Sequence, residues 1–368
     1  MSRALIITGM HRSGTSLVAN LFDKAGVQLG AQLLAADKAN PFGFFEDIDF
    51  LKFHADALHT RGQTLFVTRE FSFTPTAAET QRARELIAAR VSQSLWGWKD
   101  PRTSLFLDFW QDLLPNARFL FVYRHPLDVL VSLARRGEVL GLDFMVALEA
   151  WYVYNAQLVR FARQHPDTTL VCSSYALVEN IEQFNRMLAQ KFGLSLALNA
   201  ALRDEIYRAE HLHRIPRTPQ ADALLRQIHP DAWRMYDALQ TVAPLREAEP
   251  ALSQVEGAMP TPSVELDALC RFVAQLDSPL AASQRPALLT MLLALTAPEA
   301  IDRVVNVDAQ RTNELEWQRR AWQQTAEERA RALQDQTAWA LPRLHYLETL
   351  ERSPLVRALV RLGVLPRA

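Results

Sequence analysis

The sequence predicts an α/β fold: a P-loop-type parallel sheet flanked by helices, followed by a mostly helical C-terminal extension. Short, wholly apolar runs such as residues 119–123 are typical of strands buried on both faces of a parallel sheet. Segments with helical spacing follow these runs, and such alternation indicates an α/β domain. Strand signals are absent beyond about residue 208, which predicts the helical extension.

Four strands and five helices are expected in the first two hundred residues. The apolar runs place the strands at 4–8, 95–99, 119–123 and 168–173. Apolar residues at helical spacing place the helices at 15–25, 103–114, 127–136, 144–164 and 179–192. Gly26 and Pro115 are expected to end the first two helices.

The remainder of the chain has the pattern of helices and loops. Prolines crowd residues 211–262, which predicts loops and short helices that wrap the core. Helical pairs are expected at 266–295, one long polar helix at 306–341 and a short basic amphipathic helix at 354–362. We therefore divide the chain into an α/β domain (1–250), a helical region (251–305) and a C-terminal helical segment (306–368).

The composition excludes several classes of protein. A formal net charge of −1, from 40 basic and 41 acidic residues, lacks the cationic excess that non-specific nucleic-acid binding needs. The two cysteines, Cys172 and Cys270, lie far apart, which excludes a disulfide framework and a CxxC zinc site. No apolar stretch is long enough to span a membrane, and residues 4–7 are too short for a signal peptide. We expect a cytoplasmic protein.

Residues 9–16, Gly-Met-His-Arg-Ser-Gly-Thr-Ser, are the strongest signal of chemistry. They lie between an expected strand and an expected helix, where backbone N–H groups lack intrahelical partners and the helix dipole favours an anion. The glycine spacing is that of a nucleoside-triphosphate loop, but Thr15 occupies the position of its lysine. The segment predicts a phosphate site, and the missing lysine argues against a kinase or an ATPase.

Arg124 and Ser132 form a second candidate phosphate site. Arg124 follows the strand 119–123 at its carboxyl end, the edge at which open α/β sheets bind ligands. Ser132 lies eight residues further, on the next expected helix, close enough for both side chains to contact one phosphate. Taken alone, Arg124 fits a surface salt bridge better than a ligand site.

Together these two elements resemble the sulfotransferases that use 3′-phosphoadenosine 5′-phosphosulfate (PAPS). Residues 40–47, Asn-Pro-Phe-Gly-Phe-Phe-Glu-Asp, are similar to the N-P-x-G-[YF]-x-E segment of bacterial sulfotransferase-like proteins. Residues 96–102, Trp-Gly-Trp-Lys-Asp-Pro-Arg, are similar to their W-G-x-K-D-P-R segment, and so to a K-D-P element of tyrosylprotein sulfotransferases. The resemblance spans about residues 3–215. It implies PAPS as the donor, released as PAP (adenosine 3′,5′-bisphosphate), and no metal.

The resemblance also implies which residues bind the nucleotide. The first loop would grip the 5′-phosphosulfate through Arg12, Ser13, Gly14, Thr15 and Ser16, and the second element would grip the 3′-phosphate through Arg124 and Ser132. Further contacts are expected from Arg102 and, in the family's late basic loop, from His213 and Arg214. One departure concerns Tyr175-Ala-Leu-Val, where the family often has Tyr-Glu-Asp-Leu.

Catalysis of sulfuryl transfer needs a base for the proton of the acceptor. Glu46 is the expected base, because it fills the acidic position of the matched segment. Asp47 and His11 are the alternatives, and at least one of Glu46, Asp47 and Asp49 is expected to face solvent.

The transfer also needs cations that stabilise the charge on the bridging phosphate oxygen. Arg12 is the first candidate; many soluble relatives have a lysine at this position, and the tyrosylprotein branch has an arginine. Lys99 is the second, and it is one of only five lysines among the 40 basic residues. Its alternative role is a structural ion pair with Asp100 or Glu46.

We therefore expect a PAPS-dependent sulfotransferase whose acceptor is a hydroxyl of a carbohydrate or glycolipid. A P-loop nucleotide or sugar kinase is one alternative, and a non-catalytic scaffold whose long helix recruits a partner is another. The helix at 354–362 has three alternative roles: packing on its own domain, docking a partner protein, and peripheral contact with the inner membrane.

Overall fold

The computed structural model describes residues 2–35, 43–69, 71–135, 144–207, 212, 214, 218–247 and 285–296. The chain divides into two compact units, Met1–Val304 and Val305–Ala368, and every described element lies in the first. The helices expected at 306–341 and 354–362 lie outside the described residues, as does most of 266–295. The division at residues 250 and 305 stays a prediction.

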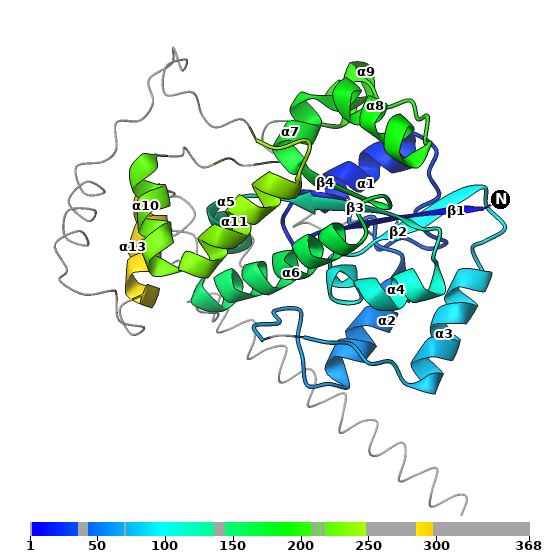
Figure 1. Ribbon diagram of the computed structural model, residues 1–368, viewed down its shortest axis with the longest axis horizontal. Helices are drawn as coiled ribbons and strands as arrows, with labels where there is room; N and C mark the ends of the chain where they lie inside the picture. The colour runs from blue at the N-terminus through cyan, green and yellow to red at the C-terminus, as the bar shows by residue number, and fades with distance from the viewer. Residues whose placement is uncertain are drawn as a thin grey trace, which may run out of the picture. The chain divides into compact units, whose positions relative to one another are not determined.

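A parallel sheet of four strands forms the centre of the first unit (Figure 1). Its strands are β1 (Arg3–Thr8), β2 (Leu95–Lys99), β3 (Arg118–Tyr123) and β4 (Thr169–Ser173), in the order β2-β1-β3-β4. Ile7 of β1 lies opposite Lys99 of β2 on one side and Leu120 of β3 on the other. The predicted parallel sheet and all four predicted strands are confirmed.

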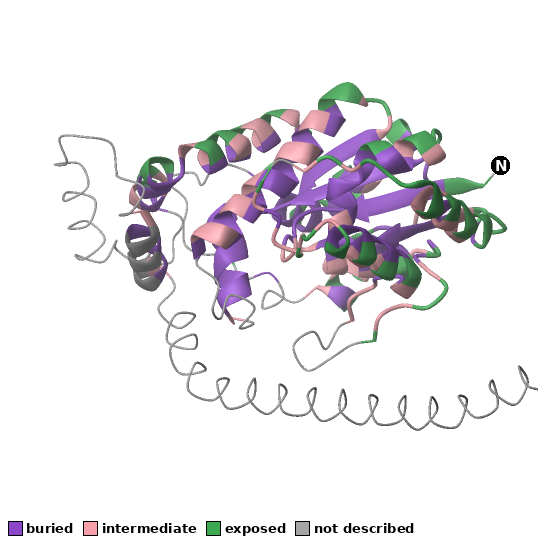
Figure 2. Ribbon diagram, turned by 90° about the horizontal axis from the view of Figure 1, so that it is seen from below, coloured by how far each residue is buried: buried purple, intermediate pink, exposed green. Residues whose placement is uncertain are grey.

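The strands are buried on both faces, which is why their central residues are consecutively apolar rather than alternating. Ile6 and Phe121 point into one apolar cluster, whereas Leu5 and Val122 point into the other. Figure 2 shows the resulting sheet, buried along nearly its whole length between exposed helix faces. The fold is therefore a sheet between two layers of helices.

Helices cover both faces of the sheet (Figure 1). The cluster that contains Leu5 includes residues of α1 (Thr15–Lys24), α7 (Ser174–Glu179), α8 (Ile181–Phe192) and α9 (Ala200–Ile206). The cluster that contains Ile6 includes residues of α2 (Ile48–His59), α3 (Ala77–Ala88), η1 (Pro101–Leu105), α4 (Leu107–Leu113), α5 (Pro126–Arg135), α6 (Phe144–Gln164), α10 (Pro219–Ile228), α11 (Pro230–Val242) and α13 (Arg285–Thr296). In the proline-rich region, α10 and α11 each begin at a proline, the residue best suited to a first helical position.

The single helix expected over 103–114 is wrong. The chain forms the 3₁₀ helix η1 and then α4, with Phe106 between them at φ −126° and ψ 20°, outside the helical region. The Asp100 side chain caps η1 by accepting a hydrogen bond from the Arg102 N–H, which fixes the start of η1 before residue 103. This cap keeps Asp100 and Arg102 together, and both belong to the site described below.

Within the described ranges, no helix combines the length and the apolarity that crossing a bilayer demands.

Candidate functional site

Segments that follow all four strands meet at the carboxyl edge of the sheet. The loop 9–14 follows β1, the 3₁₀ helix η1 follows β2, Arg124 follows β3, and α7 follows β4. The chain passes from β1 to β2 on one side and then to β3 on the other, so the sheet order reverses beside β1. Open α/β sheets bind their ligands at such a switch point.

The loop after β1 has the geometry of an anion site. Gly9 packs so closely on β3 that a Cβ atom there would lie 2.0 Å from the carbonyl oxygen of Val122. Arg12 and Gly14 have positive φ angles of 68° and 88°, and Gly14 is the N-cap residue of α1. No side chain of the described residues caps this helix. The backbone donors at the start of α1 therefore suit an anionic ligand.

The hydroxyl of Ser13 supports the same conclusion. Its Oγ atom is fully buried and has no hydrogen-bond partner among the residues that the structure describes. A buried hydroxyl without a partner is costly, so its position suits a bound ligand that would complete the hydrogen bond. Thr15 is also buried, and the Ser16 hydroxyl donates to the carbonyl oxygen of Phe44 at 3.3 Å.

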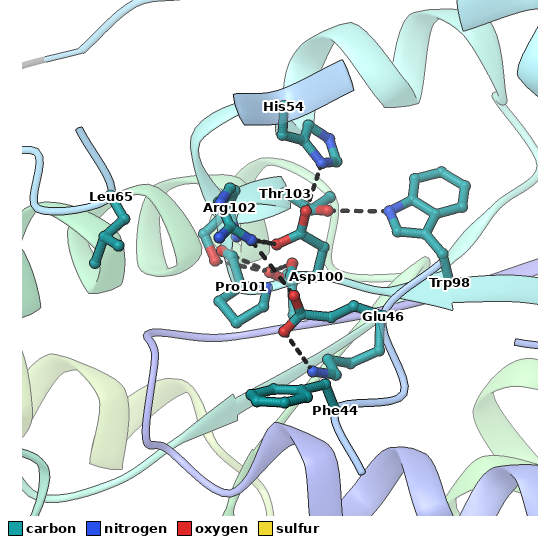
Figure 3. Close-up of polar contacts among 12 residues, drawn as sticks. Phe44, Glu46, His54, Leu65, Trp98, Asp100, Pro101, Arg102 and Thr103 are labelled. Atoms are coloured by element: carbon teal, nitrogen blue, oxygen red, sulfur yellow. Dashed lines mark hydrogen bonds and ion pairs between the residues drawn. The ribbon is translucent and has the colours of Figure 1, made fainter. Parts of the chain in front are cut away.

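Glu46 lies between two cations beside this loop (Figure 3). Its Oε1 atom accepts a hydrogen bond from Lys99 Nζ at 2.8 Å, and its Oε2 atom lies 3.5 Å from Arg102 Nη1. Lys99 Nζ also donates to Ser16 Oγ at 3.3 Å, so the ammonium group joins Glu46 to the loop. The expected ion pair of Lys99 is thus present, and the same contacts keep Lys99 at the site.

A buried network behind this pair fixes Arg102 (Figure 3). Asp100 Oδ1 accepts from Arg102 Nη1 at 2.9 Å, and Asp100 Oδ2 lies 2.8 Å from His54 Nδ1. Trp110 Nε1 donates to His54 Nε2 at 2.9 Å, so His54 Nε2 carries no proton and Nδ1–H donates to Asp100. Burial opposes the ionisation of Asp100, but the charge of Arg102 and the hydrogen bond from His54 hold its pKa below the ordinary value.

His11 is buried among the same cations. Burial, together with the charges of Arg102, Lys99 and Arg12, lowers its pKa to about 3 against an opposing effect of Asp100. The imidazole is therefore neutral at physiological pH. Its Nε2 atom has no hydrogen-bond partner in the described part of the chain.

The second element meets the first loop directly. Arg12 Nε donates to Ser132 Oγ at 3.0 Å, and Arg124 Nη1 donates to the carbonyl oxygen of Arg12 at 3.2 Å. Arg124 is 2% exposed, so it does not form the surface salt bridge that the residue taken alone suggests. The hydroxyl of Tyr175 accepts from Arg124 Nε and Nη2, at 2.9 and 2.7 Å. The Arg214 guanidinium carbon lies 4.9 Å from the centre of the Tyr175 ring.

The remaining candidates have different positions. Asp47, the alternative base, caps α2 and accepts hydrogen bonds from Arg90 Nε and Nη2 at 3.0 Å each, so its oxygens serve the fold. Asp49 is 53% exposed, in accord with the expectation that one of the three acids faces solvent. His213 lies outside the described residues. No cluster of potential metal ligands occurs in the part of the chain that the structure describes.

Two residues at the end of β4 were not among the candidates predicted from the sequence. Ser174 lies against the loop, since a Cβ atom on Gly14 would be 2.9 Å from its Cβ, and Tyr175 contacts Arg124. The criterion that selected Arg124, a polar residue directly after a buried strand, applies to Ser174, and Tyr175 is the next residue along the chain.

The chain is similar to known sulfotransferases. Residues 4–198, more than half of the chain, match the family model described as "Sulfotransferase family". A search of curated proteins finds no match.

Among solved structures, three sulfotransferases are similar to this chain. Sulfotransferase STF9 from Mycobacterium avium is 13% identical, with 66% of this chain and 75% of that chain covered and a TM-score of 0.38. The sulfotransferase domain of the olefin synthase from Synechococcus PCC 7002 is 17% identical, with coverages of 76% and 96% and a TM-score of 0.35. Sulfotransferase STF1 from Mycobacterium tuberculosis H37Rv is 13% identical, with coverages of 56% and 71% and a TM-score of 0.34.

Proposed function

Because the chain belongs to the sulfotransferase family, we propose that it transfers a sulfuryl group from PAPS to a hydroxyl of a carbohydrate or glycolipid. The observation that carries the proposal is the convergence of the two elements that we assign to phosphate binding beside the carboxylate of Glu46. Arg12, Ser132 and Arg124 form one chain of hydrogen bonds, and Lys99 connects Glu46 to Ser16 of the loop.

The described residues fit PAPS. The partnerless buried hydroxyl of Ser13 and the uncapped start of α1 suit its 5′-phosphosulfate, together with Arg12, Gly14, Thr15 and Ser16. Arg124 and Ser132 suit its 3′-phosphate, with Arg214 beside Tyr175 and, by family resemblance, His213 as further contacts. When bound, PAPS supplies the sulfuryl group that moves to the acceptor.

Glu46 is the group that we assign as the base. Lys99 and Arg102 lie against its carboxylate, which accepts the proton of the acceptor hydroxyl as the new S–O bond forms. Asp100 holds Arg102 beside Glu46, and Arg102 stays a candidate contact of the nucleotide. His11 is less suited, because Lys99, Arg12 and Arg102 all oppose its protonation. Its neutral imidazole suits a hydrogen bond to a reacting group instead.

Arg12 and Lys99 are the groups that we assign to the bridging phosphate oxygen, from which the sulfuryl group departs. Arginine holds its proton too tightly to act as an acid, so Arg12 stabilises the developing charge electrostatically. The proposal requires no metal, because fixed cations and backbone donors supply the charge stabilisation.

Ligand binding tests this function against the kinase alternative. We expect PAP to raise the melting temperature of the full chain in buffer that contains EDTA, and ATP with Mg²⁺ to leave it unchanged. Stabilisation by ATP and Mg²⁺, with none by PAP, would replace the sulfotransferase proposal with a kinase. Turnover of PAPS to PAP in the presence of acceptor would exclude the non-catalytic scaffold.

The identity of the acceptor needs a cellular experiment. We expect mass spectrometry of surface glycans and glycolipids to show sulfated species, each 80 Da heavier than its parent (about the mass of SO₃), that vanish when the gene is deleted. We also propose that the protein is cytoplasmic and that it is related to the tyrosylprotein branch of the family.

A further inference from the structure

The hydroxyl of Ser174 is a second buried polar group beside the loop that no described residue satisfies. Ser174 follows β4 directly and is fully buried, and its Oγ atom has no hydrogen-bond partner among the described residues. Buried hydroxyls normally have a partner, so each exception needs a physical reason.

The place of Ser174 against the loop supplies that reason. A Cβ atom on Gly14 would lie 2.9 Å from Ser174 Cβ and 3.3 Å from Ser174 Oγ. The residue before Gly14 is Ser13, whose hydroxyl is also buried and also has no hydrogen-bond partner among the described residues. Two buried hydroxyls without a described partner, Ser13 of the loop after β1 and Ser174 at the start of α7, therefore lie next to the glycine at the start of α1.

We propose that Ser174 is a further nucleotide-binding residue, whose hydroxyl donates a hydrogen bond to the 5′-phosphate of the donor nucleotide beside Gly14. This inference rests on the proposed function, since it concerns the same nucleotide. It adds a contact from β4 to a subsite otherwise built by the loop after β1. The close packing of Ser174 on Gly14 also explains in part why residue 14 is glycine, because any side chain there would displace Ser174.

The strand β4 offers a matched control. The hydroxyl of Thr169 is also buried without a partner in the described residues, but it lies at the other end of the strand, away from the loop. Thr169→Val removes one unsatisfied hydroxyl from the start of β4, and Ser174→Ala removes one from the residue that follows β4. Of the two variants, Ser174→Ala alone removes a hydroxyl that faces the proposed ligand.

The test compares stability and affinity in the full-length chain. We expect the melting temperature of ligand-free Ser174→Ala to equal or exceed that of the wild type, because the lost hydroxyl has no partner to abandon. We expect its affinity for PAP to fall about tenfold, the usual effect of losing one hydrogen bond to a charged group, and its affinity for adenosine 3′-phosphate to stay the same. Thr169→Val should bind both nucleotides like the wild type.

Two results would overturn the proposal: unchanged PAP affinity in Ser174→Ala, or equal losses for PAP and adenosine 3′-phosphate. If the affinity is unchanged and the melting temperature is lower, Ser174 is structural; equal losses would assign Ser174 to the adenosine portion. Failure of the wild type to bind PAP would instead contradict the proposed function itself, so the two failures are distinguishable.

Discussion

The carboxylate of Glu46 has two cationic neighbours, so its replacement affects both chemistry and stability. We expect Glu46→Gln to lower turnover by about 10²–10⁴, the usual contribution of a general base. We also expect the free energy of unfolding to fall by about 3 kcal/mol, because buried Lys99 loses its partner. Turnover at saturating PAPS and urea unfolding measure the two effects separately.

Asp47→Asn is the matched control for Glu46→Gln. It removes the adjacent carboxylate, which pairs with Arg90, and so it should destabilise the fold while turnover per folded molecule stays normal. Retained turnover in Glu46→Gln would transfer the role of the base to His11.

Arg124 and Ser132 should distinguish nucleotides that carry the 3′-phosphate from those that lack it. We expect Ser132→Ala and Arg124→Ala to weaken PAP binding, since charge-assisted bonds to arginine contribute about 1.5–3 kcal/mol. Adenosine 5′-phosphosulfate, which has no 3′-phosphate, should lose much less affinity in calorimetric titrations. Arg124→Ala should affect it slightly, because Arg124 also holds the Arg12 carbonyl oxygen. Equal losses for both ligands would contradict the assignment.

The lowered pKa of His11 predicts a specific sensitivity to acid. The unfolded chain binds a proton at His11 below pH 6.5, whereas the folded chain does so only near the lowered pKa of about 3. Stability must therefore fall as the pH decreases through this window. Between pH 6.5 and 4.5 we expect the free energy of unfolding of His11→Gln to fall by about 2 kcal/mol less than that of the wild type, as measured by urea unfolding. His59→Gln, at an exposed histidine, should follow the wild type.

At the scale of elements, the strands were predictable and several helices were not. Burial on both faces leaves wholly apolar strand sequences, so 119–123 could be recognised without its neighbours. The helix α3 was missed because only Ala83 is buried on it, which leaves little periodicity. Its start was nevertheless written in the sequence, since Thr76 and Glu79 have the spacing of a capping box.

The site was predictable in part for a related reason. Motif spacing identified Arg12, Lys99, Glu46 and Arg124, and their contacts place them together. His54 could not be found, because its role depends on the packing of Trp110 beside Asp100, residues about fifty positions away in the chain. Such pairings follow from tertiary structure and not from local pattern.

The capping box of α3 supports a prediction about acid stability. Glu79 accepts from the Thr76 N–H and pairs with Arg61, which extends from the region after α2. The hydrogen bond from Arg61, against the effect of burial and with help from Thr76, lowers the pKa of Glu79 to about 2. This stability is present above the ordinary pKa and is lost as the pH falls toward 2.

We therefore expect Glu79→Gln to destabilise the chain by about 1 kcal/mol at pH 7, with a difference that shrinks below pH 4.5. Urea unfolding at several pH values measures it. Glu85→Gln, on the same helix, should have little effect because Glu85 is exposed and contacts only Gln81 among the partners described for its side chain. A constant difference at all pH values would disprove the role of the ionised Glu79.

At the scale of the whole molecule, the prediction concerns residues 354–362, which the structure does not describe. At 100° per residue, Leu355, Leu359 and Leu362 share one face, and Arg357 and Arg361 lie opposite. If this helix contacts an anionic bilayer, binding is weak, about 1 kcal/mol per arginine. In that case the full chain co-sediments with anionic liposomes at low salt, and a chain that ends at Glu351 stays in the supernatant. Absence of both from the pellet would leave packing or a protein partner.

The position of β1 in the middle of the sheet also affects how the chain folds during its synthesis on the ribosome. One edge of β1 stays unpaired until the segment with Lys99 has been made, and the other until the segment with Leu120 has been made. The Tyr175 hydroxyl that Arg124 contacts is made later still. Until β2 and β3 have both been made, the apolar strand β1 has at least one unpaired edge exposed to other nascent chains, a state prone to aggregation. The proposed nucleotide site includes Ser174, so nucleotide could engage the whole site only after β4 has docked. The nascent protein should therefore depend on chaperones, and slowing translation before residue 120 should lower its soluble yield.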